Sequence, residues 1–199
     1  MIQLKRLLNE LNIQQKQSIG SGFEQTVYPS VVKPNTVIKK FTADEDMYSI
    51  EDWEDVIKTA KQHPDLFALV YKVDIDKRYF IQEKLDEKTL TKECLELSKY
   101  LFKNNINIGS GDIFTFLYLQ PNRINILDNT PWQSTLKPKI KNFFDRLHQA
   151  GYGPNKTFIG DIRLTNLGYD TSGKIKILDF NFESEYDWSG IDTPGDPNM

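Results

Sequence analysis

The sequence GDIRLTN at residues 160–166 is followed, after a short turn that contains glycine, by ILDFN at residues 177–181. In the first segment Asp161 precedes Asn166 by five positions, and in the second Asp179 comes directly after an apolar, strand-forming run. Carboxylate and amide oxygens are the ligands that Mg²⁺ prefers in proteins. The pattern therefore predicts a place where two Mg²⁺ ions and a phosphate-accepting hydroxyl group could meet.

Composition and charge set limits on this chain of 199 residues. A hydrophobic fraction of 39% and a charged fraction of 27% are typical of a chain that forms one core or two small lobes. The net charge of −3 argues against a nucleic-acid partner, because phosphate-binding surfaces normally carry a basic excess. No apolar run approaches the roughly 18 residues of a membrane-spanning helix. With a single cysteine, Cys94, and no signal-peptide pattern, we expect a cytoplasmic protein.

The first 85 residues have the composition of short strands with one helix between them. Residues 26–28 and 36–41 are β-branched and apolar, with turn-forming glycine and proline residues around them. Residues 49–62 begin with acidic and end with basic side chains, which favours a helix. Two further strands are predicted at 66–73 and 78–85. A short amphipathic helix is predicted before all of these, at the N-terminus.

From residue 89 onward the pattern becomes mainly helical. Helices are predicted at 89–103 and 137–150, with Gly151 as the C-cap of the second. Between them, the β-prone run at 113–127, interrupted by a Pro-Asn pair, predicts an inserted hairpin. A final hairpin is predicted at 167–178. The order of these elements indicates a fold of the α+β class.

The segments GDIRLTN and ILDFN resemble the catalytic loop and the metal-binding turn of protein kinases, H-R-D-x-x-x-x-N and D-F-G. The resemblance implies a bilobal protein-kinase-like fold. Residues 1–85 would form the N-terminal helix and a β-rich small lobe. Residues 86–199 would form a reduced, mainly helical large lobe, with the inserted hairpin near 113–127 and the catalytic loop and metal turn at 159–181.

The same resemblance implies a role for each polar residue of the two motifs. Asp161 would accept or orient the proton of the substrate hydroxyl, and Arg163 would support the phosphoryl group in transfer. Asn166 would hold one Mg²⁺, and Asp179 would bridge the metal ions to the phosphates.

The segment GSGFEQTV at residues 20–27 resembles the glycine-rich loop G-x-G-x-x-G-x-V, with Gln25 in place of the third glycine. Gly20 and Gly22 would let backbone amides approach phosphate closely, since no Cβ intervenes. Val27 occupies the position of the family's valine and is implied to bind the nucleotide. Taken alone, the two glycines fit an ordinary hairpin turn better.

The run Val37-Ile38-Lys39 resembles the V-A-I-K strand of kinases. Strand alternation places Val37 and Lys39 on one face, toward a nucleotide. The resemblance pairs Lys39 with an acidic residue of the next helix, for which Glu54 is the best candidate and Glu51 the alternative. Farther along, Gln82 would be the gatekeeper, and backbone groups of Glu83 and Leu85 would bind adenine; an ordinary strand end also explains these residues.

The sequence departs from the kinase pattern in several places. Ile159 and Gly160 replace the histidine and arginine of H-R-D, and the Gly-Asp pair is instead similar to the loop of aminoglycoside-type small-molecule phosphotransferases. Asn181 replaces the glycine of D-F-G. Too few residues follow it for an A-P-E segment and for the helices that complete a large lobe.

The resemblance implies a phosphotransferase that depends on ATP and Mg²⁺. The leading interpretation is a minimal protein kinase without an activation segment, similar to short bacterial effector or phage kinases, acting on a protein hydroxyl in the cytoplasm or in a host cytoplasm. Two alternatives remain: a pseudokinase-type scaffold that acts through a protein partner, and a small-molecule kinase. Transfer of AMP instead of phosphate is a related possibility.

Overall fold

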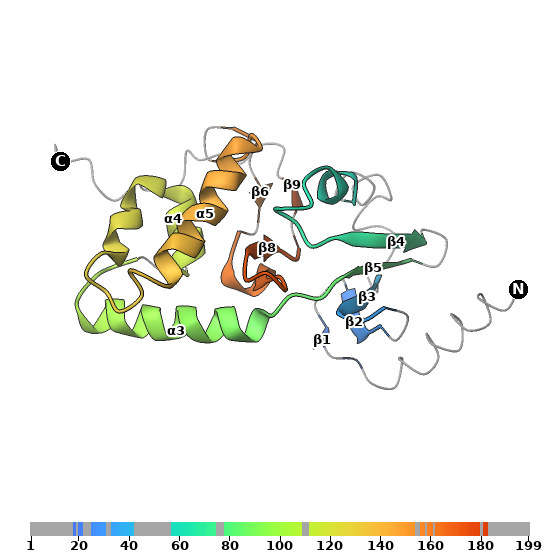
Figure 1. Ribbon diagram of the computed structural model, residues 1–199, viewed down its shortest axis with the longest axis horizontal. Helices are drawn as coiled ribbons and strands as arrows, with labels where there is room; N and C mark the ends of the chain where they lie inside the picture. The colour runs from blue at the N-terminus through green and yellow to red at the C-terminus, as the bar shows by residue number, and fades with distance from the viewer. Residues whose placement is uncertain are drawn as a thin grey trace, which may run out of the picture.

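The computed structural model separates a strand-rich N-terminal part from a mainly helical C-terminal part (Figure 1), which confirms the predicted α+β class. None of the helices in the described part of the chain is long and apolar enough to cross a membrane. The residues that the structure describes are 18, 20–21, 25–30, 33–41, 57–74, 78–108, 112–153, 156–157, 159–160, 162–179 and 181–182.

The N-terminal part is built on a five-stranded antiparallel sheet with strand order β1-β2-β3-β5-β4. Its strands are β1 (Gly20–Ser21), β2 (Gln25–Pro29), β3 (Thr36–Phe41), β4 (Val70–Asp74) and β5 (Tyr79–Glu83). The strands predicted from composition at 26–28, 36–41 and 78–85 are confirmed. Of the helix predicted at 49–62, residues 57–62 are helical, and the remainder lies outside the described residues, as does the predicted N-terminal helix.

The strand predicted at 66–73 begins later in the structure, at Val70. Leu66 and Phe67 are fully buried, and Phe67 forms a parallel bridge with Ile177. The backbone N–H of Ala68 donates to the Ile177 carbonyl at 2.8 Å, and the Ile177 N–H donates to the Leu66 carbonyl at 2.8 Å. These residues therefore join the N-terminal part to the C-terminal part instead of extending the sheet.

The C-terminal part contains helices and short antiparallel strand pairs. In chain order its elements are α3 (Glu87–Lys103), α4 (Ile113–Leu119), the 3-10 helix η1 (Pro121–Leu127), α5 (Leu136–Gln149), β6 (Ile159–Gly160), the 3-10 turn η2 (Leu164–Asn166), β7 (Leu167–Tyr169), β8 (Ile175–Ile177) and β9 (Asn181–Phe182). Here β6 pairs with β9 and β7 pairs with β8. In Figure 1 the β8 region lies between the helices and the sheet.

The hairpin predicted at 113–127 is wrong, because this segment is helical. Ile113, Phe114, Leu117 and Tyr118 are all buried, at the spacing of one helix face. The run is so continuously apolar that its composition favours strands, while the spacing of its buried residues is that of a helix. Asp112 starts α4 by accepting hydrogen bonds from backbone amides of its first turn, and a proline at the first position starts η1.

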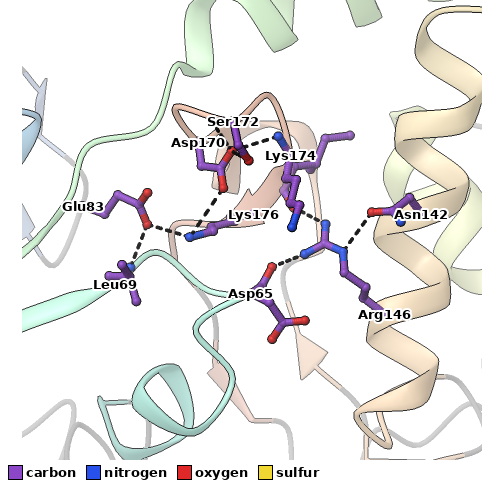
Figure 2. Close-up of polar contacts among 10 residues, drawn as sticks. Asp65, Leu69, Glu83, Asn142, Arg146, Asp170, Ser172, Lys174 and Lys176 are labelled. Carbon is purple, nitrogen blue, oxygen red and sulfur yellow. Dashed lines mark hydrogen bonds and ion pairs between the residues drawn. The ribbon is translucent and has the colours of Figure 1, made fainter.

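Arg146 of α5 links the two parts of the chain at a second place. Its guanidinium donates to the backbone carbonyl of Asp65, to that of Ile175 at 2.8 Å, and to the Asn142 side chain at 3.0 Å (Figure 2). Burial lowers the pKa of this guanidinium, against the opposing charges of Asp65 and Asp170. The helical core thus holds both the turn before β4 and the strand β8 at fixed positions.

Candidate functional site

One row of residues crosses the sheet from the glycine-rich segment to β4. The strand registers pair Gly20 with Val27, Val27 with Lys39, Lys39 with Phe80, and Phe80 with Val73. Directly opposed residues project from the same face of a sheet. Neighbouring strands lie about 4.8 Å apart, so the Gly20 backbone is roughly 10 Å from that of Lys39 across one intervening strand.

Lys39 projects from this row to the metal turn predicted from the sequence. It is 5% exposed, its Nζ donates to the Leu178 carbonyl at 2.9 Å, and the same nitrogen lies 3.7 Å from Oδ2 of Asp179. Burial lowers the pKa of Lys39, and the negative charges of Asp179 and Glu87 oppose that shift. The structure therefore brings together two residues that are 140 positions apart in the sequence.

Gln82 of β5 places a second donor on the same carbonyl. Its Nε2 donates to the Leu178 oxygen at 3.2 Å. This bond fixes the orientation of the amide, because turning it over would point Oε1 at another acceptor. Its Oε1 is buried and has no hydrogen-bond partner among the residues that the structure describes. A buried acceptor without a donor costs about 1–3 kcal/mol, so this oxygen suits a ligand that carries an N–H group.

A backbone hydrogen bond places Asn166 beside the metal turn. The Leu178 N–H donates to the Asn166 carbonyl at 2.8 Å, which extends the β7–β8 pairing by one step and sets Asn166 opposite the residue that precedes Asp179. The Asp179 side chain is 45% exposed, so its carboxylate keeps access to water and to further ligands. One carboxylate and one amide therefore stand at neighbouring backbone positions.

Asp161, Gly22 and Glu54 lie outside the described residues, as does Glu51. The neighbours of Asp161 are nevertheless placed. On one side Gly160 pairs with Asn181, two residues after Asp179. On the other side the carbonyl of Ile162 accepts a hydrogen bond from Thr115 Oγ1 at 3.1 Å. The chain is therefore held next to the metal turn before Asp161 and against α4 after it.

Arg163 is exposed and stands at the N-cap of η2, where its carbonyl accepts from the Asn166 N–H at 2.9 Å. It thus lies in the same loop as Asn166, with its side chain directed to the surface. Val27 is half-buried and sits directly across from Lys39 on β2.

Glu83 and Leu85 lie where β5 passes into α3. The Glu83 carboxylate is turned into the protein, where it accepts from Lys176 Nζ at 2.9 Å and from the Leu69 N–H at 3.1 Å (Figure 2). Leu85 is buried next to Gly168, where an added Cβ would come within 2.7 Å of the Leu85 Cβ. The connection between the two parts is thus fastened to the β7–β8 hairpin by side-chain contacts.

The structure also reveals contributors that the sequence patterns did not assign to the site. Glu87, in the first turn of α3, lies close enough to act on the charge of Lys39. Partial burial raises the pKa of Glu87, while Lys39 and Lys84 oppose that shift. The Leu178 carbonyl is a backbone group, and no side-chain pattern could have indicated it. An acidic residue just after the β5 end was the only available signal for Glu87.

The residues present fit a magnesium nucleotide. Among the described residues, no three His, Cys, Asp or Glu side chains gather as they would in a metal cage made wholly of protein. Mg²⁺ is usually held by one or two carboxylates together with substrate phosphates, so the donors of Asn166 and Asp179 suffice. The unpaired Gln82 oxygen matches a base with an amino group, and Lys39 supplies a cation for phosphate.

No protein-family model matches the sequence, and no curated protein matches it either. Solved structures do match. Choline kinase LicA from Streptococcus pneumoniae is 14% identical, with 87% of this chain and 70% of that chain covered and a TM-score of 0.41. A choline/ethanolamine kinase family protein from Mesorhizobium loti is 12% identical, with 82% and 56% covered and a TM-score of 0.37. The streptomycin–ATP–APH(2″)-IIa ternary complex is 14% identical, with 89% and 71% covered and a TM-score of 0.37.

Two of these three proteins are kinases by description, the class whose motifs the sequence resembles. A further matching structure is LicA in complex with AMP, at 15% identity and a TM-score of 0.41. At identities and TM-scores this low, the role of the site has to be argued from its own geometry.

Proposed function

We propose that the protein is a phosphotransferase that uses ATP and Mg²⁺ to phosphorylate a hydroxyl group. The observation that carries this proposal is the contact of buried Lys39 with both the Leu178 carbonyl and the Asp179 carboxylate. A lysine next to a metal-binding carboxylate, on the sheet face that begins at a glycine-rich strand, is the arrangement that phosphoryl transfer from a nucleotide requires.

Each residue has a distinct task in this reaction. Lys39 would bind the α and β phosphates, and Asp179 with Asn166 would hold the metal. Mg²⁺, when bound, neutralises the charge that develops on the transferring phosphate. Asp161 would orient the acceptor hydroxyl and take its proton, and Arg163 would support the phosphoryl group. The Gln82 oxygen would accept a hydrogen bond from the amino group of adenine.

The charge state of Lys39 is central to phosphate binding. Burial lowers its pKa, which weakens the protonated form, while Asp179 and Glu87 act in the opposite direction. Phosphate groups would add negative charge at short range, and an opposite charge within a few ångström favours the protonated lysine. Binding of the nucleotide would therefore give the Lys39 ammonium further negatively charged partners.

Two classes of acceptor are consistent with the sequence. The glycine-rich loop and the catalytic segment resemble those of protein kinases, so a protein hydroxyl is one class. Gly160 before Asp161 is similar to small-molecule phosphotransferases, so a small hydroxyl compound is the other. Choline, ethanolamine and streptomycin are the compounds to try first, because the solved structures that match this chain carry these names.

The proposal is tested with γ-labelled ATP, Mg²⁺ and the purified protein, with each small compound, with a protein mixture and with no acceptor. We expect label transfer by the wild type and its loss, by at least about 100-fold, in Lys39→Met and Asp179→Asn. Asp145→Asn is the control, because Asp145 is exposed on α5, where it pairs with Lys141.

Other outcomes of this experiment decide against the proposal. Nucleotide binding without transfer to any acceptor assigns the chain to the scaffold class. In a parallel assay with α-labelled ATP, transfer of that label without transfer from γ-labelled ATP assigns the chain to AMP transfer. Equal transfer by Asp179→Asn and the wild type contradicts the assigned site.

A further inference from the structure

Asp112 makes contacts that reach well beyond its own helix. Its Oδ1 accepts from the backbone amides of Phe114 at 2.8 Å and Thr115 at 3.2 Å, which caps α4. Its other oxygen, Oδ2, accepts from the backbone amide of Leu164 at 2.6 Å. The two ends of that last bond are 52 residues apart in the chain. A single carboxylate therefore ties the start of a helix to the loop between Asp161 and Asn166.

Thr115 strengthens the same connection. Its hydroxyl donates to the Ile162 carbonyl at 3.1 Å. The loop backbone is thus hydrogen-bonded at Ile162 and at Leu164, on the two sides of Arg163. Both hydrogen-bonding side chains come from the N-terminus of α4: Asp112 is its N-cap and Thr115 lies in its first turn. Ile113, Phe114 and Leu117 of this helix are buried in the main core. These hydrogen bonds therefore attach the loop to a helix that close packing in the core holds in place.

We propose that Asp112, assisted by Thr115, is a positioning residue that sets the backbone of the catalytic loop and thereby the places of Asp161 and Asn166. This inference rests on the proposed function. Asp112 itself would touch neither nucleotide nor acceptor. Its effect would pass through the backbone of residues 162–164, which joins the proton-accepting Asp161 to the metal-binding Asn166.

Chemistry explains why an acid occupies this position. Helix capping alone needs one oxygen, which asparagine, serine or threonine supplies equally well. The second contact needs another acceptor aimed at the Leu164 N–H, and only a carboxylate offers two acceptor oxygens on a side chain this short. Leu164 is also buried, so its amide would otherwise lack water as a partner.

The expected size of the effect follows from geometry. A displacement of reacting groups by about 1 Å can slow a reaction on the order of 100-fold. Loss of the loop contact should therefore reduce kcat for ADP formation from Mg-ATP by about 10-fold to 100-fold. Binding of ADP in the presence of EDTA should change by less than about twofold, because without the metal it depends on Lys39, Gln82 and the glycine-rich strand, which are not attached to this loop contact.

Asp112→Asn is the variant that separates the two contacts. The asparagine oxygen keeps the helix cap, while its amide group meets the Leu164 N–H as donor against donor. Asp86→Asn is the matched control. Asp86 caps α3, and its second oxygen accepts from the Thr89 hydroxyl of the same helix at 2.6 Å, so this substitution tests a similar chemical change without a loop contact.

Thr115 supplies a second pair of variants. Thr115→Val removes the hydroxyl and keeps the shape, and Thr115→Ser keeps the hydroxyl. We expect Thr115→Val to lower kcat and Thr115→Ser to restore most of it. The double variant Asp112→Asn, Thr115→Val should lose less than the product of the two single losses, because both residues hold one loop.

Amide hydrogen exchange provides a readout that does not depend on catalysis. We expect exchange of the Leu164 amide to accelerate at least about 10-fold in Asp112→Asn, with no change in Asp86→Asn. Faster exchange together with unchanged kcat overturns the inference, and so does a kcat loss matched by equally weakened binding of ADP without Mg²⁺. If the wild type forms no ADP, the proposed function fails. The loop contact is tested separately: equal exchange of the Leu164 amide in the wild type and in Asp112→Asn disproves it.

Discussion

Two buried lysines on opposite sides of the interface between the strand-rich and helical parts have different surroundings. Lys39 and Lys176 are each 5% exposed. Lys176 lies 2.9 Å from a Glu83 oxygen and 3.7 Å from an Asp170 oxygen, and both carboxylates are themselves nearly buried. Among the described residues, Lys39 contacts one carboxylate at 3.7 Å, which is half exposed, and one backbone carbonyl.

The difference matches a structural role for Lys176 and the binding role proposed for Lys39. Lys176 is saturated by acids inside the protein, and the network also fixes Asp170 (Figure 2). Burial disfavours the charged form of Asp170, but hydrogen bonds from Ser172 and Lys174 and the charge of Lys176 together hold its pKa below the ordinary value. The carboxylate that Lys39 contacts in the described part of the chain, that of Asp179, faces water. The first lysine stabilises the fold, and the second is the one to which the proposed function assigns phosphate.

The largest expected effect comes from breaking the saturated network with Lys176→Met. Removal of this lysine leaves the Glu83 carboxylate buried without its cation, so we expect the free energy of unfolding to fall by about 3–5 kcal/mol in urea titrations. The double variant Lys176→Met, Glu83→Gln should recover most of the loss, because the neutral amide can still accept from the Leu69 N–H. A loss below about 1 kcal/mol for Lys176→Met would show that the network is not structural.

Gly168→Ala tests the packing on the same side of the interface. The added methyl group would come within 2.7 Å of the Leu85 Cβ and 3.3 Å of the Glu87 backbone nitrogen. We expect the free energy of unfolding to fall by about 1–3 kcal/mol, as for other overpacked sites. Thr171→Ala, in the exposed turn of the same hairpin, is the control. Equal stability of both variants would mean that this close approach does not matter.

The pH dependence of stability distinguishes Lys39 from an exposed lysine. Its folded pKa lies below the ordinary 10.5, with burial as the largest cause, so the folded state releases this proton before the unfolded state does. Between the lowered pKa and 10.5, the wild type should therefore gain stability relative to Lys39→Met as pH rises, by at most about 1.4 kcal/mol per pH unit. If the stability of the wild type relative to Lys39→Met instead falls as pH rises in urea titrations, the lowered pKa of Lys39 is contradicted.

The smallest expected change in stability is that of Lys39→Met at neutral pH. The substitution removes a buried charge, leaves Asp179 in contact with water and leaves Gln82 on the Leu178 carbonyl. We expect the free energy of unfolding to stay within about 1 kcal/mol of the wild type or to rise. A loss as large as that of Lys176→Met would remove the distinction between the two lysines.

Local patterns were sufficient where a segment's own residues determine its structure. The β-branched run at 36–41 forms β3 with the predicted bounds, and the amphipathic stripe at 137–150 forms α5. The run at 113–127 was misassigned because composition favoured strands, whereas the cap at Asp112 and the surrounding core favour a helix. Tertiary packing decided that segment, and its sequence alone did not.

The same division holds for the site. The spacing of Lys39 and Asp179 within ordered motifs was enough to expect their proximity, and the structure places them together. Lys176 could not be identified, because the alternation at 174–177 gives it the outward face of a strand. In the fold it is nevertheless buried and lies beside the carboxylates of Glu83 and Asp170. The Leu164 contact of Asp112 joins residues far apart in sequence, and no local pattern reports it.

The most direct test of the central claim is calorimetric titration of ATP into the wild type, Asp179→Asn and the control Asp145→Asn, each with Mg²⁺ and with EDTA. If Asp179 holds the metal on a nucleotide bound at Lys39, Mg²⁺ should tighten binding to the wild type and to Asp145→Asn by at least about 10-fold and leave Asp179→Asn unchanged. The same Mg²⁺ dependence in all three proteins, or no ATP binding by the wild type, would contradict it.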